Sequence, residues 1–199
     1  MNKLILSTDN KNKILEIKEA LQGLPLSIYA KSDYLTEKID VDEKFDTLEE
    51  NAKAKAEALK AYVKDAYILS DDTGLFIEAL NGEPGVHSAR YAKDHNDRAN
   101  IDKVLDKLKG KDNRSAYFKT IFYLITPQGE ERVIEGICPG QILKEIQGKE
   151  TFGYDPIFQP QGKDFSFGQM TLEEKNQISH RGKALKALKE VFKELLIES

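Results

Sequence analysis

The sequence has a single cysteine, no long hydrophobic run and no excess of basic residues. Because Cys138 cannot form a disulfide within the chain, nothing indicates an oxidising compartment. The N-terminus has only Leu4–Leu6 before the polar Ser7, which is too short for the apolar core of a signal peptide. The longest apolar run, around Ile121–Ile125, is far too short to cross a membrane. These absences predict a cytoplasmic protein with no membrane partner.

The charge balance is slightly acidic, with 34 acidic and 30 basic residues and a formal net charge of −4. Such a surface is poorly suited to neutralising a nucleic-acid backbone or an anionic membrane, so no nucleic-acid partner is expected. A small anionic ligand is compatible with this balance, because its binding depends on the local field inside a site.

The length and the hydrophobic pattern predict one α/β domain over residues 1–199. A chain of 199 residues with 40% hydrophobic content can bury a core, and no linker or repeat divides it. Apolar runs predict strands at 4–7, 26–30, 67–69, 75–77, 116–125 and 132–143, and helical spacing predicts helices after residue 10 and over 47–63, 96–108 and 179–198. We expect a hairpin turn at Thr126–Gly129, and we expect the polar Ser70–Gly74 to interrupt a strand.

The first segment that could bind a ligand or take part in catalysis is Thr8–Lys13, a polar loop between a strand and a helix. Unpaired N–H groups and the helix dipole attract phosphate at a helix N-terminus, and Lys13 would add a full positive charge. The simpler interpretation is that Thr8 or Asn10 only caps the helix, and this segment alone favours it.

The second segment is the predicted helix over 47–63. Its apolar stripe includes Ala52, Ala56 and Leu59, and Lys55 falls within this stripe whereas Lys53 points away from it. A lysine on an inward face needs an anion, which is either a structural carboxylate or a bound phosphate.

Acidic residues form the third candidate. Asp71 and Asp72 follow a predicted strand, and one of them could bind magnesium, which needs only one or two carboxylates beside phosphate oxygens and waters. Asp42 and Glu43 are further possible ligands. An acidic turn and a solvated charged loop are the structural alternatives.

Two later segments could contact a base. Gly153 and the proline after Asp155 predict a rigid loop at Phe152–Pro156, which could display Phe152 for stacking or simply contribute an aromatic to the core. Ser179 is a predicted N-cap, followed by His180 and Arg181 in the first helical turn. Basic residues there oppose the helix dipole, so either a ligand or a surface salt bridge would explain them.

The order and the amino-acid sequences of these segments closely resemble those of the Ham1 family of inosine/xanthosine triphosphate pyrophosphatases. The resemblance covers nearly the whole chain. The matching segments are Thr8–Lys13, Glu50–Ala52, Ser70–Leu75, Pro84–Tyr91, Phe152–Pro156 and Ser179–Arg181.

This resemblance implies an elongated mixed β-sheet flanked by helices, with two lobes and a central active-site cleft. It also implies Mg²⁺-dependent hydrolysis of non-standard purine nucleoside triphosphates to the monophosphate and pyrophosphate, by a homodimer. Asp72, Lys13 and Lys55 are the implied catalytic residues, and Glu43 and Asp72 the implied metal ligands. The implied substrate-binding residues are Thr8, Asp9, Asn10, Lys11, Asn12, Lys13, Thr73, Phe152, Gly153, Tyr154, Asp155, Lys175, His180 and Arg181.

Some positions depart from the commonest pattern of the family. Thr73 replaces a serine and keeps its hydroxyl, and His87 replaces a tyrosine. Lys93 and Thr151 stand where glycine is common.

Other function classes fit the sequence less well. The related Maf-type pyrophosphatases act on thymidine or uridine triphosphate, but their typical motifs are absent here. A nucleotide sensor without turnover would be separated from an enzyme by a pyrophosphate-release assay. The chain has no G-x-x-x-x-G-K-[ST] string, which removes the P-loop interpretation. Cys138 lies outside every matching segment, so no cysteine nucleophile is expected.

Overall fold

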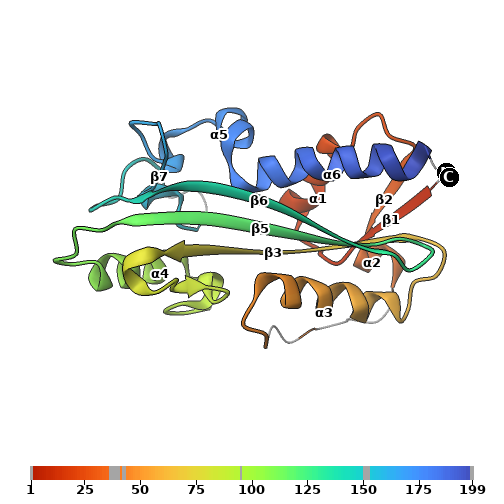
Figure 1. Ribbon diagram of the computed structural model, residues 1–199, viewed down its shortest axis with the longest axis horizontal. Coiled ribbons are helices and arrows are strands. Elements are labelled where there is room, and N and C mark those ends of the chain that lie inside the picture. Colours follow the sequence, from red (N-terminus) through yellow and green to blue (C-terminus); the bar gives the residue numbers. More distant parts are fainter. Residues whose placement is uncertain (1, 36–40, 42–43, 95, 150–152, 198–199) are drawn as a thin grey trace. The chain divides into compact units, whose positions relative to one another are not determined.

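The computed structural model describes residues 2–35, 41, 44–94, 96–149 and 153–197 (Figure 1). The strands are β1 (Asn2–Leu6), β2 (Leu26–Ala30), β3 (Tyr67–Ile77), β4 (Pro84–Gly85), β5 (Ser115–Ile125), β6 (Glu131–Ile142) and β7 (Phe158–Pro160). The α-helices are α1 (Lys11–Ala20), α2 (Lys31–Tyr34), α3 (Leu48–Lys60), α4 (Asp97–Lys107), α5 (Leu172–Ile178) and α6 (His180–Ile197). Short 3₁₀ helices lie at Glu78–Leu80, Ser88–Arg90, Asp155–Ile157 and Phe167–Gln169.

The strands form one mixed sheet in the order β2-β1-β3-β5-β6-β7, and β4 pairs with β3. Strand β1 runs parallel to both β2 and β3. Strand β4 is antiparallel to β3, and β7 is antiparallel to β6. The prediction of a mixed α/β fold is therefore confirmed.

The chain groups into two compact units. The first unit comprises Met1–Asp72, Ile121–Glu135 and Ala184–Ser199, and the second comprises Thr73–Thr120 and Gly136–Lys183. A single domain over residues 1–199 and a cleft between two lobes both stay predictions.

Strand β3 contains the one expectation about local structure that was wrong. Ser70–Gly74 does not interrupt it, because the strand runs unbroken from Tyr67 to Ile77. Polar groups can lie in a buried strand when each has a partner, and the Ser70 hydroxyl donates to the Ala52 carbonyl oxygen at 2.5 Å. Gly74 allows the close approach of β4, since a Cβ there would lie 2.6 Å from the Gly85 carbonyl oxygen.

The core of the first unit follows the alternation of strand residues between the two faces of a sheet. On one face, Leu4, Leu6 and Leu69 pack with apolar side chains of α1 and of the later part of α6. Helix α3 lies on the other side of these strands (Figure 1), and the Ser70 to Ala52 hydrogen bond joins it to β3. Each face of β3 in this unit therefore meets a different helix.

Several boundaries follow from capping groups that the sequence displays. The Thr47 hydroxyl accepts the Glu50 N–H at 3.2 Å where α3 begins. The Ser179 hydroxyl accepts the Gly182 N–H at 3.0 Å, which confirms the predicted start of α6. The predicted hairpin joins β5 and β6, and the Thr126 N–H donates to the Glu130 carbonyl oxygen at 2.9 Å.

Helices α2 and α5 and strands β4 and β7 were not predicted. A capping box marks the start of α5, because Thr171 accepts the Glu174 N–H and donates its own N–H to the Glu174 carboxylate. This signal was present in the sequence. Among the described residues, no helix combines the length and the apolar character needed to cross a membrane.

Replacing Phe192 tests the core of the first unit. This ring is fully buried and lies 5.3 Å from the Tyr67 ring, edge to face. We expect Phe192→Ala to lower the free energy of unfolding by about 3–5 kcal/mol in urea titrations, since it leaves a cavity. Leu172→Ala is the control, because Leu172 is 65% exposed and should shift stability by less than about 0.5 kcal/mol. Equal losses would contradict this assignment of the core.

Candidate active site

Two adjacent carboxylates in β3 each meet a lysine of the first unit. Asp71 and Asp72 are buried, with 7% and 8% of their surfaces exposed. Lys13 Nζ lies 2.7 Å from Asp71 Oδ2. Lys55 Nζ lies 3.0 Å from Asp72 Oδ1, and it also donates to the Asp71 carbonyl oxygen at 3.0 Å. Consecutive strand residues point to opposite faces, which explains why two different helices provide the lysines.

Helix α1 carries Lys13 to the strand. The Asn10 side chain caps this helix by accepting the N–H groups of Asn12 and Lys13 at 3.0 and 3.2 Å. The Thr8 hydroxyl accepts the Asn10 N–H at 3.2 Å. These contacts agree with the predicted helix cap. They occupy backbone N–H groups that could otherwise donate to a phosphate.

The rest of the Thr8–Lys13 segment has other surroundings. Asp9 accepts the Ser32 N–H at 3.1 Å, and so it contacts the start of α2. Lys11 and Asn12 are exposed. Of this predicted phosphate cradle, the structure brings Lys13 to the carboxylates of β3.

Helix α3 separates its two lysines as the spacing predicts. The Lys55 side chain is 16% exposed and reaches β3. Lys53 is 41% exposed, and its ammonium group pairs with Glu131 at 3.0 Å. The hydrogen bond from Lys53 to Glu131 raises the pKa of Lys53. Lys53 therefore forms an ion pair at the surface, whereas Lys55 belongs to the carboxylate cluster, which we define as Asp71, Asp72, Lys13 and Lys55.

In the second unit, the loop around Tyr154 is held by buried polar contacts. The Tyr154 hydroxyl donates to the Ser88 carbonyl oxygen at 2.7 Å, and burial raises its pKa, so it remains a neutral donor. The Gly153 N–H donates to Asp97 at 2.8 Å, and Gly153 adopts a φ of +53°, which favours glycine. These contacts fix Gly153 and Tyr154 of the predicted substrate loop.

Two other predicted substrate residues of this unit form an ion pair. Lys175 Nζ lies 2.5 Å from Asp155 Oδ2, and Asp155 is only 4% exposed. The hydroxyl groups of Thr73 and Thr120 lie 2.8 Å apart and share a hydrogen bond. The hydroxyl that Thr73 retains is thus anchored to β5.

His180 begins helix α6 and is almost completely buried. Its ring stacks on Phe118, with centroids 4.6 Å apart and planes inclined by 17°. Burial, and to a smaller extent the positive charges of Lys175, Arg181 and Lys183, together lower the pKa of His180 to about 3. His180 is therefore a neutral imidazole at physiological pH. Arg181, the next residue, is partly buried.

Part of the predicted site lies outside the described residues, namely Glu43 and Phe152, together with the further candidate Asp42. Within the described ranges, no group of three or more His, Cys, Asp or Glu side chains could surround a metal ion. Cys138 is buried, and burial raises the pKa of its thiol, which opposes a role as a nucleophile.

Asp71 was predicted only as a possible magnesium ligand, and the structure shows that it holds Lys13. Two further supporting residues were not predicted. Asp97 holds Gly153, and Phe118 supports His180. Neither of these has a local signal, because each partner lies far away in the chain.

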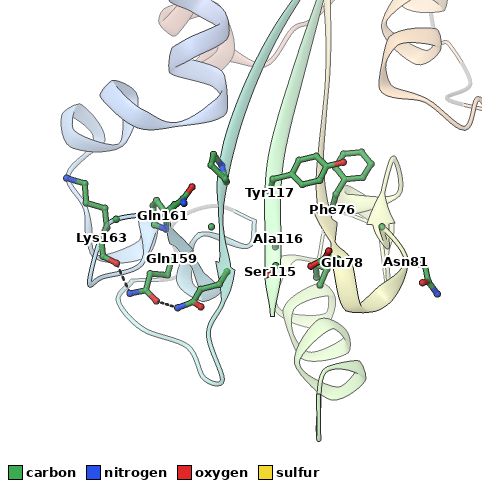
Figure 2. Close-up of a pocket in the computed structure, with 16 residues that line it drawn as sticks. Phe76, Glu78, Asn81, Ser115, Ala116, Tyr117, Gln159, Gln161 and Lys163 are labelled. Carbon is green, nitrogen blue, oxygen red and sulfur yellow. Dashed lines mark hydrogen bonds between the residues drawn. The ribbon is translucent and has the colours of Figure 1, made fainter. Parts of the chain in front are cut away.

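A hollow of about 870 Å³ in the second unit contains none of the predicted site residues. Figure 2 shows Phe76 and Tyr117 on one side of it and Gln159, Gln161 and Lys163 on the other. The Phe76 and Tyr117 rings are stacked 5.0 Å apart. This hollow does not contribute to the candidate site.

Comparisons with known proteins agree with each other. The sequence profile of the Ham1 family matches residues 4–191. The chain is 44% identical to the dITP/XTP pyrophosphatase of Caldanaerobacter subterraneus subsp. tengcongensis, with 100% of both chains covered. It is 46% identical to that of Christiangramia forsetii, with 94% of this chain and 97% of the relative covered.

Solved structures give the same result. The Staphylococcus aureus Ham1 protein superimposes with a TM-score of 0.88 at 36% identity, covering 100% of both chains. A HAM1 protein from Coxiella burnetii gives a TM-score of 0.89 at 35% identity, covering 98% of this chain and 100% of that one.

The buried His180 predicts a specific pH dependence of stability. Its folded-state pKa of about 3 lies below the unfolded value near 6.5, so below pH 6.5 the unfolded chain binds a proton that the folded protein does not. Stability is therefore lost as the pH falls, and His180 should account for about 2 kcal/mol between pH 7 and pH 5. We expect His180→Gln to remove this part of the pH dependence of the free energy of unfolding. The exposed His87→Gln should keep it, and identical profiles for wild type and His180→Gln would contradict a buried neutral ring.

Proposed function

The chain belongs to the Ham1 family, and we propose that it hydrolyses the triphosphates of inosine, deoxyinosine and xanthosine to the monophosphate and pyrophosphate. Two full-length relatives at 44% and 46% identity are dITP/XTP pyrophosphatases. The geometric observation that carries the proposal is the pair of Lys55 and Asp72, which places an ammonium group 3.0 Å from a buried carboxylate. In such a pair, the ammonium group can bind a phosphate and the carboxylate can orient a water molecule.

The proposed reaction breaks the bond between the bridging oxygen and the α-phosphorus. Asp72 orients the attacking water and accepts its proton, which is the usual role of a positioned carboxylate. Lys13 and Lys55 both pair with carboxylates of β3, and their charges would stabilise the triphosphate and the leaving pyrophosphate. No covalent intermediate is required.

We propose that the second unit recognises the base. Inosine and xanthosine carry a carbonyl at purine position 6, where adenosine carries an amino group. Hydrogen-bond donors from His180 and Arg181 would favour the carbonyl, and a buried pair of donors facing each other would cost about 1–3 kcal/mol per group. Lys175, paired with Asp155 at 2.5 Å, and the Phe152–Tyr154 loop complete the proposed substrate contacts.

The chemistry of Asp72 is compatible with the proposed Mg²⁺. A hard cation accepts carboxylate oxygens, and one or two carboxylates suffice when phosphate oxygens and waters complete the shell. Asp72 would hold the ion together with Glu43. When bound, Mg²⁺ would neutralise charge on the phosphate oxygens.

The remaining proposals rest on the resemblance and on composition. We propose a cytoplasmic homodimer, formed by a single domain over residues 1–199 with the active site in a central cleft. The buried free thiol of Cys138 is compatible with a reducing compartment.

A comparison of the two lysines of α3 tests the phosphate site. We expect Lys55→Ala to lower kcat/KM for inosine triphosphate on the order of 10²-fold, because it removes a preorganised charge. Lys53→Ala is the matched control, since it removes only an exposed ion pair and should leave kcat/KM within about twofold. Steady-state pyrophosphate release measures both. Similar losses in the two variants would place the active site elsewhere.

A substrate panel tests the reaction itself. With Mg²⁺ present, we expect pyrophosphate release from inosine, deoxyinosine and xanthosine triphosphates and little from the adenosine, uridine or thymidine compounds. Asp72→Asn keeps the size of the side chain but removes its charge, and we expect a loss of activity on the order of 10³-fold. Preference for uridine or thymidine triphosphate would indicate the Maf-type alternative, and binding without turnover would indicate a sensor.

A further inference from the structure

The base-contacting histidine proposed above rests on an aromatic cluster of the second unit. Phe118 stacks on His180 on one side and meets Phe158 edge to face, at a centroid distance of 4.7 Å and an angle of 61°. Phe158 and Phe167 also contact each other at 5.2 Å. All three phenylalanines are buried, so the Phe118 ring has little freedom to move. The plane of the imidazole is therefore set by a ring that is itself fixed.

The surroundings of the imidazole also select its protonation. Nδ1 is buried and has no hydrogen-bond partner among the residues that the structure describes. An orphaned buried N–H is rarer than an under-satisfied acceptor, so an unprotonated Nδ1 is favoured and the single proton of the neutral ring lies on Nε2. The charges that act on the ring come from Lys175 of α5 and from Arg181 and Lys183 of α6, and all three are positive. The Cys138 thiol on β6 lies near the His180 backbone, and burial keeps this thiol neutral. These surroundings oppose a second proton on the ring.

We propose that Phe118 is a positioning residue for base selection, which holds His180 in one plane as a neutral imidazole whose only hydrogen-bond donor is Nε2. The stacked geometry, the buried Nδ1 and the fixed cluster beneath Phe118 carry this inference. This inference rests on the proposed function, because the Nε2–H donor would select bases that carry a carbonyl at position 6. A ring that tilted or exchanged its proton would lose this directionality, since it could then face an amino group with an acceptor.

The first test uses the wild-type protein without substrate. Two-bond ¹H–¹⁵N correlation spectra distinguish the two neutral tautomers and the imidazolium, and the sequence has only three histidines. The His180 signal is assigned by its loss in His180→Gln. We expect the Nε2–H tautomer throughout pH 5–8. A proton on Nδ1, or titration near the ordinary histidine pKa, would overturn the proposal without any variant of Phe118.

The second test removes the stacking ring. We expect Phe118→Leu to lower the ratio of kcat/KM for inosine triphosphate over adenosine triphosphate on the order of tenfold, and to allow mixed tautomers in the spectrum. Phe118→Tyr keeps the flat ring and should restore the wild-type ratio and spectrum. Phe192→Leu is the packing control, because it removes a buried ring from the first unit and should leave the ratio unchanged.

The outcomes separate this proposal from the proposed function. An enzyme that hydrolyses inosine triphosphate but keeps its base ratio and its tautomer in Phe118→Leu would overturn the role of Phe118 alone. Wild-type protein that releases no pyrophosphate from inosine triphosphate would overturn the proposed function, and base selection by His180 with it.

Discussion

Two neighbouring carboxylates in the buried strand β3 constrain how the first unit is built. A buried charge is strongly destabilising unless an opposite charge and hydrogen bonds compensate it. Because strand residues alternate between faces, one helix cannot provide both partners. Lys13 comes from α1 and Lys55 from α3, at 2.7 and 3.0 Å from Asp71 and Asp72 respectively. The Ser70 to Ala52 hydrogen bond fixes α3 at the same level of the strand. The positions of both helices therefore depend on the charges that the strand carries.

The same charges would serve the proposed phosphate chemistry. Each ammonium group lies against a carboxylate, so Lys13, Lys55, Asp71 and Asp72 together are close to electrically neutral. In the proposed reaction, phosphate oxygens compete with the carboxylates for Lys13 and Lys55, so binding exchanges one anion for another around cations that are already positioned. Little reorganisation is then needed when charge develops on the leaving group, which is the condition for efficient electrostatic stabilisation. Asp72 becomes more available to a water molecule through the same exchange.

Features with a local cause could be predicted from the sequence. The helical period distinguishes Lys55 from Lys53, and the hydroxyl of Ser179 marks the start of α6. The unbroken β3 could not be predicted in this way, because its polar residues are compatible with a strand only once α1 and α3 provide partners. Phe118 beneath His180 is also a contact between distant segments, and no pattern within either segment indicates it. The family resemblance provided residue roles that composition and periodicity alone left open.

The proposed recognition of the base in the second unit differs physically from the proposed binding of phosphate at the carboxylate cluster. A purine base carries no net charge, so strong charges would bind it without distinguishing a carbonyl from an amino group. Selection requires a group with a defined donor in a fixed direction, in surroundings where an unmade hydrogen bond is costly. In the proposed base site His180 would meet these requirements, because burial keeps it neutral and Phe118 stacks on its ring. The cations Lys175, Arg181 and Lys183 then have a second effect, since their repulsion prevents the ring from gaining the proton that would make both nitrogens donors. Burial, supported by this repulsion, therefore keeps His180 neutral.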